Sequence, residues 1–389
     1  MMTIVTTDAL AAFCERARSR PYVTVDTEFL RERTYYSQLC LVQLALPGDA
    51  EDDAVLVDPL APDLSLEPLY ALFRDADVVK VFHAARQDIE IFCLEGGVIP
   101  QPLFDTQVAA MVCGYGDQAG YETLVRKIAR AQVDKTSRFT DWSRRPLSDA
   151  QKAYALADVT HLRGIYEYLA AELERTGRTA WVEEELAVLS DPDTYRIRPE
   201  DAWKRIKTRN GSGRMLAVVR ELAAFREAYA QDRNVPRGRV FKDDALVELA
   251  TAKPQNEADL GRLRLLLREA RRGDIAEGIL AAVKRGLAAD PADFPQPDRS
   301  RDNLQVNPAL ADLLRVLLKS KSETAGVAQK LIASSADLDT IASGGRDVAA
   351  LGGWRAEVFG HDALRLCRGE VGLAAKGCDV VVFALGRDA

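Results

Sequence analysis

The pattern of hydrophobic and polar positions predicts that the chain begins with an α/β domain. Thr7 or Asp8 can cap a helix that is predicted to run to about Ser19. Three short, largely apolar segments come next, at 22–29, 38–46 and 54–59, and each is predicted to form a strand. Short connections join them, and short connections are typical of neighbouring antiparallel strands. The pattern therefore predicts an antiparallel meander directly after the first helix.

The following segments complete the predicted domain. Residues 78–82 are apolar almost without interruption, as expected of a strand that is covered on both faces. A turn into a helix is expected after His83, and Asp105 is predicted to cap a further helix, which is a structural role. Ser148 and Gln151 form the pattern of a capping box at the start of a long helix. Helices among these strands predict an α/β domain with a mixed sheet.

The composition is that of a soluble globular protein. The chain has 389 residues, of which 47% are hydrophobic and 29% charged, which is enough chain for two or three domains. No apolar run has the length of a membrane span, and no signal-peptide pattern is expected at the N-terminus. The six cysteines form no Cys-x-x-Cys pair, so reduced core cysteines in a cytoplasmic protein are predicted.

The net charge of −7 is unevenly distributed. Residues 1–202 hold 21 Lys and Arg against 34 Asp and Glu, residues 203–290 hold 19 against 12, and residues 291–389 hold 12 against 13. The three parts thus carry −13, +7 and −1, which indicates units with different partners. The basic middle part is where contacts with a nucleic-acid backbone are expected, and Arg237 and Arg239 are among its candidates.

Two carboxylates stand on one face of the first predicted strand. Asp26 and Glu28 are two residues apart, and side chains at i and i+2 of a strand project to the same side. Neighbouring carboxylates repel and raise each other's pKa unless a cation lies between them. A divalent metal ion is one explanation of the pair. An ordinary solvated pair is the other, because Asp-x-Glu is a common pattern.

Two later segments carry residues that could complete a metal site. Asp88 lies in the first turns of the helix after His83, although the helix dipole alone also favours a carboxylate there. Tyr154 and Asp158 are four residues apart on the long helix, so they lie on one helix face. A surface Tyr–Asp pair is the alternative interpretation. The order, spacing and context of these residues are what make the set informative.

Taken together, these segments resemble the DEDD superfamily of 3′→5′ exonucleases, in its tyrosine branch, and more narrowly the ribonuclease D family. The first motif of that family, Asp-x-Glu on a strand, falls on Asp26 and Glu28. The aspartate of its second motif falls on Asp88. Its third motif, Tyr-x-x-x-Asp, falls on Tyr154 and Asp158.

The resemblance covers about residues 1–190 and implies a ribonuclease H-like exonuclease domain with a mixed sheet. It also implies hydrolysis with two divalent metal ions, Mg²⁺ or Mn²⁺, which prefer oxygen ligands. The implied ligands are Asp26, Glu28, Asp88 and Asp158. Tyr154 would orient the attacking water. Free tyrosine titrates at about pH 10, so orientation is favoured over a full general-base role.

A second resemblance concerns the basic middle part. Residues 203–285, and 234–246 in particular, are similar to an HRDC domain, which is a small helical bundle. A linker rich in Pro and Asp is expected at 287–303. The family leads us to expect a divergent second HRDC-like domain at 304–389, although 379–385 by itself predicts a strand. The expected fold is therefore the exonuclease domain followed by one or two small all-α bundles.

Residues between the second and third motifs are candidates for contacts with single-stranded RNA. Basic groups on the backbone and aromatic rings under the bases are the usual means of binding single strands. The candidate RNA-binding residues are Lys135, Arg138, Trp142, Arg144 and Arg145. A solvated basic loop with one packed Trp is the alternative.

The function implied by the resemblance is that of a metal-dependent 3′→5′ exoribonuclease that releases nucleoside 5′-monophosphates. Precursors of tRNA and other small structured RNAs are the implied substrates. A DNA exonuclease is the first alternative, because the carboxylates recognise metal and phosphate rather than the 2′-hydroxyl. A non-catalytic nucleic-acid-binding scaffold is the second, and the presence of all five motif residues argues against it. Neither a protein partner nor a membrane association is predicted.

Overall fold

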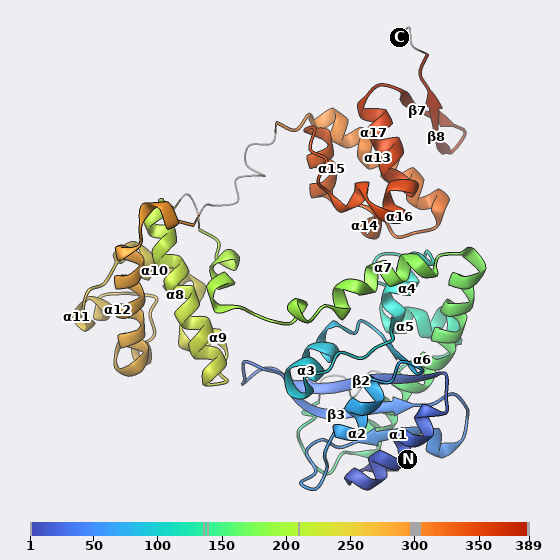
Figure 1. Ribbon diagram of the computed structural model, residues 1–389, viewed down its shortest axis with the longest axis horizontal. Coiled ribbons are helices and arrows are strands. Elements are labelled where there is room, and N and C mark those ends of the chain that lie inside the picture. Colours follow the sequence, from blue (N-terminus) through green and yellow to red (C-terminus); the bar gives the residue numbers. More distant parts are fainter. Residues whose placement is uncertain (1, 135–136, 138–139, 209–210, 296–304, 387–389) are drawn as a thin grey trace.

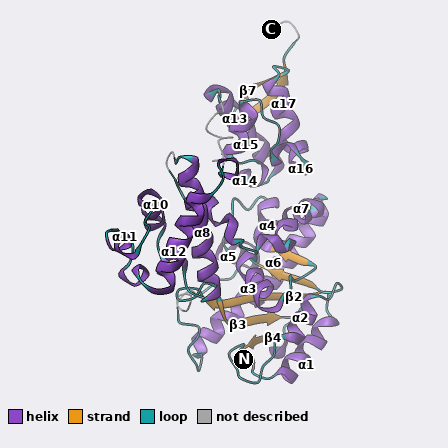
Figure 2. Cartoon of the chain, turned by 60° about the vertical axis from the view of Figure 1, so that its left-hand side comes forward, coloured by secondary structure: helices purple, strands orange, loops and turns teal. Residues whose placement is uncertain are grey.

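The computed structural model describes residues 2–134, 137, 140–208, 211–295 and 305–386. Three units follow one another along the chain and are separately visible in Figure 1. The first holds the large sheet, the second is a bundle of helices, and the third combines helices with a hairpin. The helices and the sheet are also distinguished by colour in Figure 2.

The first unit is built on one six-stranded mixed sheet with strand order β1-β4-β3-β2-β5-β6. Its strands are β1 (Met2–Ile4), β2 (Tyr22–Leu30), β3 (Gln38–Ala45), β4 (Ala54–Val57), β5 (Val79–Phe82) and β6 (Leu103–Asp105). β2, β3 and β4 are antiparallel neighbours, so the predicted meander is confirmed. β5 and β6 extend the sheet in parallel beside β2. The sequence pattern did not predict β1 and β6, because three residues show no periodicity.

Helices cover both faces of this sheet. The helices of the first unit are α1 (Thr7–Arg18), α2 (Glu67–Phe73), α3 (Arg86–Gly96), α4 (Thr106–Val112), α5 (Tyr121–Leu124), the π-helical turn η2 (Val125–Ala129), α6 (Asp149–Thr176) and α7 (Thr179–Ser190). Val23 and Val25 of β2 are fully buried in the core cluster that α1, α2 and α3 share. The opposite face of β2 lies against α6, where the Thr24 hydroxyl donates to the carbonyl of Val159 at 2.9 Å. Thr24 and Asp26, which alternate with the valines along β2, therefore face α6.

The second unit is helical, as predicted. It consists of the 3₁₀ segment η4 (Pro199–Arg205) and the helices α8 (Gly213–Asp232), α9 (Arg237–Val240), α10 (Asp243–Ala252), α11 (Glu257–Gly261) and α12 (Gly273–Ala288). Leu222, Phe241 and Ile279 belong to its buried core. A loop of the first unit contacts this bundle, since the Tyr35 hydroxyl donates to buried Glu227 and the backbone amides of Tyr35 and Tyr36 donate to Asn234.

The third unit is not purely helical. Its elements are α13 (Pro308–Ala325), α14 (Gln329–Ile332), α15 (Ser335–Ala342), α16 (Gly353–Arg355), the π-helical turn η8 (Ala356–Gly360), α17 (His361–Cys367), β7 (Val371–Lys376) and β8 (Asp379–Ala384). The hairpin of β7 and β8 corrects the expectation of an all-α bundle and agrees with the strand pattern at 379–385. Trp354 stacks on Trp181 of α7 with ring centroids 4.7 Å apart, which joins this unit to the first.

Within the described ranges, no helix combines the length and the apolar character that are needed to cross a membrane.

Candidate active site

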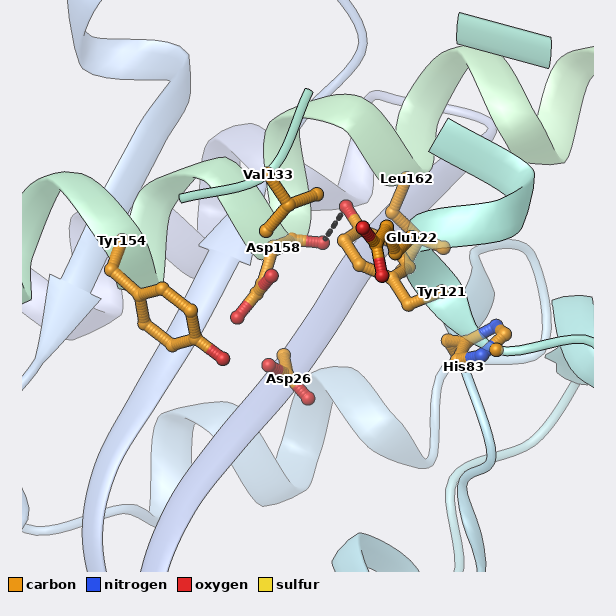
Figure 3. Close-up of a pocket in the computed structure, with 9 residues that line it drawn as sticks. Asp26, His83, Tyr121, Glu122, Val133, Tyr154, Asp158 and Leu162 are labelled. Carbon is orange, nitrogen blue, oxygen red and sulfur yellow. Dashed lines mark hydrogen bonds between the residues drawn. The ribbon is translucent and has the colours of Figure 1, made fainter. Parts of the chain in front are cut away.

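β2 and α6 bring Asp26, Tyr154 and Asp158 together at one pocket (Figure 3). The Tyr154 hydroxyl and the Asp26 and Asp158 carboxylates point into the same space. The pocket has a volume of about 260 Å³. It is lined by Asp26, His83, Gly120, Tyr121, Glu122, Val133, Tyr154, Asp158 and Leu162.

Local structure places the other two motif carboxylates next to this pocket. The β2–β3 register shifts between Glu28 and Phe29, and such irregularities redirect side chains at the ends of sheets. Asp88 lies in the first turn of α3, where it accepts a hydrogen bond from the Thr27 hydroxyl. Asp105 shapes the turn that leads into α3, because its carboxylate accepts from the backbone amides of Ala84 and Ala85 at 3.0 and 2.9 Å. Asp105 also caps α4, where its carboxylate accepts from the backbone amide of Gln107 at 2.8 Å, so its predicted capping role is confirmed.

The electrostatics of the site centre on Asp26. Burial raises the pKa of its carboxyl group well above the usual value, and the negative charges of Asp158, Asp88 and Glu28 raise it further. Four carboxylates that disfavour each other's charge store unfavourable energy unless a cation is present. This arrangement is the electrostatic character expected of a cation-binding site.

The metal-free protein is predicted to lose stability as the pH rises, because burial raises the pKa of Asp88 to about 7. A carboxyl group whose pKa is higher in the folded than in the unfolded chain stabilises the fold at low pH. This contribution is lost as the pH rises from about 4 to about 7. In EDTA, the thermal midpoint should therefore fall less for Asp88→Asn than for the wild type between about pH 5 and pH 8.

The control for this experiment is Asp63→Asn, because Asp63 is an exposed aspartate of the same domain. Its midpoint should follow that of the wild type at every pH. Parallel pH curves for the wild type and Asp88→Asn would show that Asp88 does not titrate differently in the folded and unfolded chains.

Two tyrosines have distinct positions around Asp158. Burial raises the pKa of Tyr154, and the charges of Asp158, Glu28 and Asp26 raise it further, so its hydroxyl keeps its proton in the metal-free site. The Tyr121 hydroxyl donates to the backbone carbonyls of Ala157 and Asp158 at 3.1 and 2.7 Å. Tyr154 therefore presents its hydroxyl to the carboxylates, whereas Tyr121 holds the helix turn that carries Asp158.

The donor chemistry of the site fits hard divalent cations. Carboxylate oxygens are the ligands that Mg²⁺ and Mn²⁺ prefer. Among the residues that the structure describes, no three His, Cys, Asp or Glu side chains are already arranged around one point as metal ligands. The fit therefore rests on the type of donor and on the mutual repulsion of the four carboxylates, not on a preformed cage.

The candidate RNA-binding residues that the structure describes, Trp142, Arg144 and Arg145, lie in different environments. Lys135 and Arg138 lie outside the described residues. Trp142 is 2% exposed and packs 6.1 Å from the Tyr154 ring, so its faces are covered and it is not placed to stack on a base. Arg145 binds Asp58 through two hydrogen bonds of 2.6 and 2.7 Å. For Trp142 and Arg145 the structure corrects the expectation, because Trp142 packs behind Tyr154 and the Arg145 guanidinium is bound to Asp58. The Arg144 side chain is 85% exposed.

The pocket also contains residues to which the sequence analysis gave no role. The Thr106 hydroxyl donates to the carbonyl of Phe82, so His83 Nδ1 must donate to Thr106 Oγ1, which lies 3.0 Å away. In this tautomer, His83 Nε2 is the ring nitrogen that can accept a hydrogen bond. Tyr121 and Glu122 lie at the start of α5. No short motif marks these positions, and they reach the site through contacts that are distant in sequence.

Comparison with known proteins places this geometry in a family. A family model described as "3′-5′ exonuclease" matches residues 1–174, and one described as "HRDC domain" matches residues 215–283. Ribonuclease D from Jannaschia sp. (strain CCS1) is 68% identical over 380 residues, which is 98% of each chain. Ribonuclease D from Granulibacter bethesdensis is 50% identical over 99% of this chain and 97% of its own.

The chain belongs to the ribonuclease D family. Among solved structures, Escherichia coli RNase D superposes with a TM-score of 0.81 at 31% identity, over 94% of this chain and 98% of that one. A Bifidobacterium adolescentis protein shares the fold with a TM-score of 0.70 at 22% identity. As a member of this family, the protein is a 3′→5′ exoribonuclease and a hydrolase. Its RNA substrate and the use of a divalent metal ion follow from this membership.

Proposed function

We propose that Asp26, Glu28, Asp88 and Asp158 hold two divalent metal ions, Mg²⁺ or Mn²⁺. The observation that supports this most directly is the group of three acidic neighbours that raise the pKa of Asp26. When bound, the ions would supply an acidified water and neutralise charge at phosphorus and on the departing 3′-oxygen. The chain itself contributes the positions of the ligands, through β2, α3 and α6.

Tyr154 would orient the water that attacks the terminal phosphodiester. Its hydroxyl keeps its proton, so it acts as a hydrogen-bonding group rather than as a strong base. The ring is held in place by Trp142, which packs behind it. The products would be nucleoside 5′-monophosphates, because the bond to the 3′-oxygen is the one that breaks.

The substrates that we propose are RNAs with a single-stranded 3′ end beside a duplex, with precursors of tRNA as the first candidates. Support comes from the full-length similarity to ribonucleases D and from the basic HRDC unit, which offers charge to an RNA backbone that the acidic first domain does not. A DNA strand would present the same phosphates, so the test compares both.

The experiment uses a hairpin RNA with a 3′ tail and a 5′ label, incubated in Mg²⁺, in Mn²⁺ and in EDTA beside the equivalent DNA. We expect a ladder that shortens from the 3′ end with either metal, stops near the duplex, and is absent in EDTA. A precursor tRNA should be trimmed at its 3′ trailer. Preference for DNA would overturn the proposal that RNA is the substrate. Cleavage in EDTA would overturn the proposed metal mechanism.

Replacing Tyr154 with phenylalanine is predicted to slow the chemical step by about 10²-fold, a typical loss when one positioned hydrogen-bonding group is removed. The ring and its packing against Trp142 remain, so the fold should be unchanged. Single-turnover rates at saturating metal measure the step directly. A rate within a factor of about two of the wild type would show that the hydroxyl takes no part.

A further inference from the structure

Gln43 of β3 lies directly beside Asp26. The antiparallel register pairs Asp26 with Gln43, and paired residues project from the same face with Cβ atoms about 4.5–5.5 Å apart. Gln43 is fully buried, at 0% exposure. Among the described residues, neither its side-chain nitrogen nor its side-chain oxygen has a hydrogen-bond partner. A buried, unpaired amide therefore stands next to the central carboxylate of the site.

Such a group is costly, and its surroundings do not explain it. An amide that is buried without a hydrogen-bond partner loses its hydrogen bonds to water and gains none in return. The residue paired with Gln43 on the other side is Leu56 of β4, which belongs to a buried apolar cluster with Leu41 and Ala155. Leucine or methionine would suit this position better if packing alone mattered. Of the two residues that flank Gln43 across the sheet, the polar one is Asp26.

A second carboxylate of the site shows what a neutral donor from the sheet does. The Thr27 hydroxyl of β2 donates to Asp88, and this hydrogen bond favours the charged form of Asp88. The donor adds no charge to a cluster that already holds four carboxylates. Asp26 has the same need, and the Gln43 amide is the neutral donor that the register places beside it.

We propose that Gln43 is a positioning residue for Asp26. Its side-chain N–H donates to an oxygen of the Asp26 carboxylate when that carboxylate binds a divalent cation, which orients the carboxylate toward the ion. Each carboxylate oxygen has two lone pairs, so one oxygen can accept from an amide and still bind a metal. Outer partners of this kind commonly contribute 10–100-fold to metal affinity or activity. The inference rests on the proposed metal site.

The test replaces Gln43 with methionine, which keeps the length of the side chain and removes its polar atoms. We expect the concentration of Mn²⁺ at half-saturation, measured by calorimetric titration of the protein without RNA, to rise about tenfold. The thermal midpoint in EDTA should stay equal or increase, because an unsatisfied amide is removed. If the amide is merely tolerated at this position, the thermal midpoint should increase in the same way while the metal affinity stays unchanged. That result would overturn the proposal.

Leu56→Met is the matched control, because it introduces the same side chain in the same layer on the neighbouring strand. Its metal affinity should equal that of the wild type. An equal loss of affinity in both variants would assign the effect to packing and reject the role of the amide. If the wild type itself binds no Mn²⁺, the proposed metal site fails and not merely the role of Gln43.

A structural measurement keeps the proposal testable if Gln43→Met does not fold. In a crystal structure of the wild type with Mn²⁺, Gln43 Nε2 should lie within about 3.2 Å of an Asp26 carboxylate oxygen. An amide that remains turned away from Asp26 while the metal is bound would overturn the inference.

Discussion

Asp26→Asn is expected to reduce RNA cleavage by at least about 10³-fold, or roughly 4 kcal/mol of transition-state stabilisation. Asparagine has the size of aspartate but lacks the charge that binds a divalent cation. In EDTA the variant should be at least as stable as the wild type, because it removes one of four repelling carboxylates whose charge is disfavoured by burial. In Mg²⁺ this order should reverse, because a ligand that binds the folded state stabilises it.

The measurements are single-turnover cleavage and thermal midpoints with Mg²⁺ and with EDTA. Asp63→Asn, at an exposed position of the same domain, should behave as the wild type in both. RNA binding by Asp26→Asn should persist, since the basic HRDC unit is unchanged. Cleavage within about tenfold of the wild-type rate would remove Asp26 from the metal site.

Arg237→Met is expected to destabilise the HRDC unit by about 3 kcal/mol. Glu227 of α8 is 1% exposed, and Arg237 donates two hydrogen bonds to its carboxylate, at 2.6 and 2.8 Å. The guanidinium also lies 5.0 Å from the centre of the Tyr35 ring. Removing the arginine would leave a buried carboxylate with the Tyr35 hydroxyl as its remaining side-chain partner among these contacts.

Thermal or urea unfolding measures this loss, and the double variant Glu227→Gln/Arg237→Met should recover most of it. Arg239→Met is the matched control, two residues away on the exposed surface of the same helix, and should leave stability unchanged. If Arg237→Met weakened RNA binding in a salt-dependent way without loss of stability, Arg237 would be an RNA contact rather than a structural residue.

Local patterns in the sequence were sufficient for much of the catalytic domain. Short apolar segments with short connections predicted β2 and its antiparallel neighbours, and spacing placed Asp26 with Glu28 and Tyr154 with Asp158. Side-chain caps are equally local. The predicted capping box of Ser148 and Gln151 is present at the start of α6. These features depend on residues two to four positions apart, whose geometry is set by the helix and the strand themselves.

The tertiary structure decided the roles that depend on distant partners. Arg145 pairs with Asp58, which is 87 residues away, and Arg237 binds a glutamate that the sequence shows only as one charge among many. Both were candidates for RNA contacts, because a basic residue in a loop has the same appearance whether its partner is RNA or a buried carboxylate.

Gln43 illustrates the same division most clearly. Its position in an apolar strand is visible in the sequence. Its pairing with Asp26, however, depends on the β2–β3 register, and its burial depends on the packing of α6 against the sheet. The sequence alone predicted which residues would carry the chemistry that we propose for this site. The packing of α6 on the sheet decided which side chains lie beside them, because contacts between distant segments leave no periodic pattern in the chain.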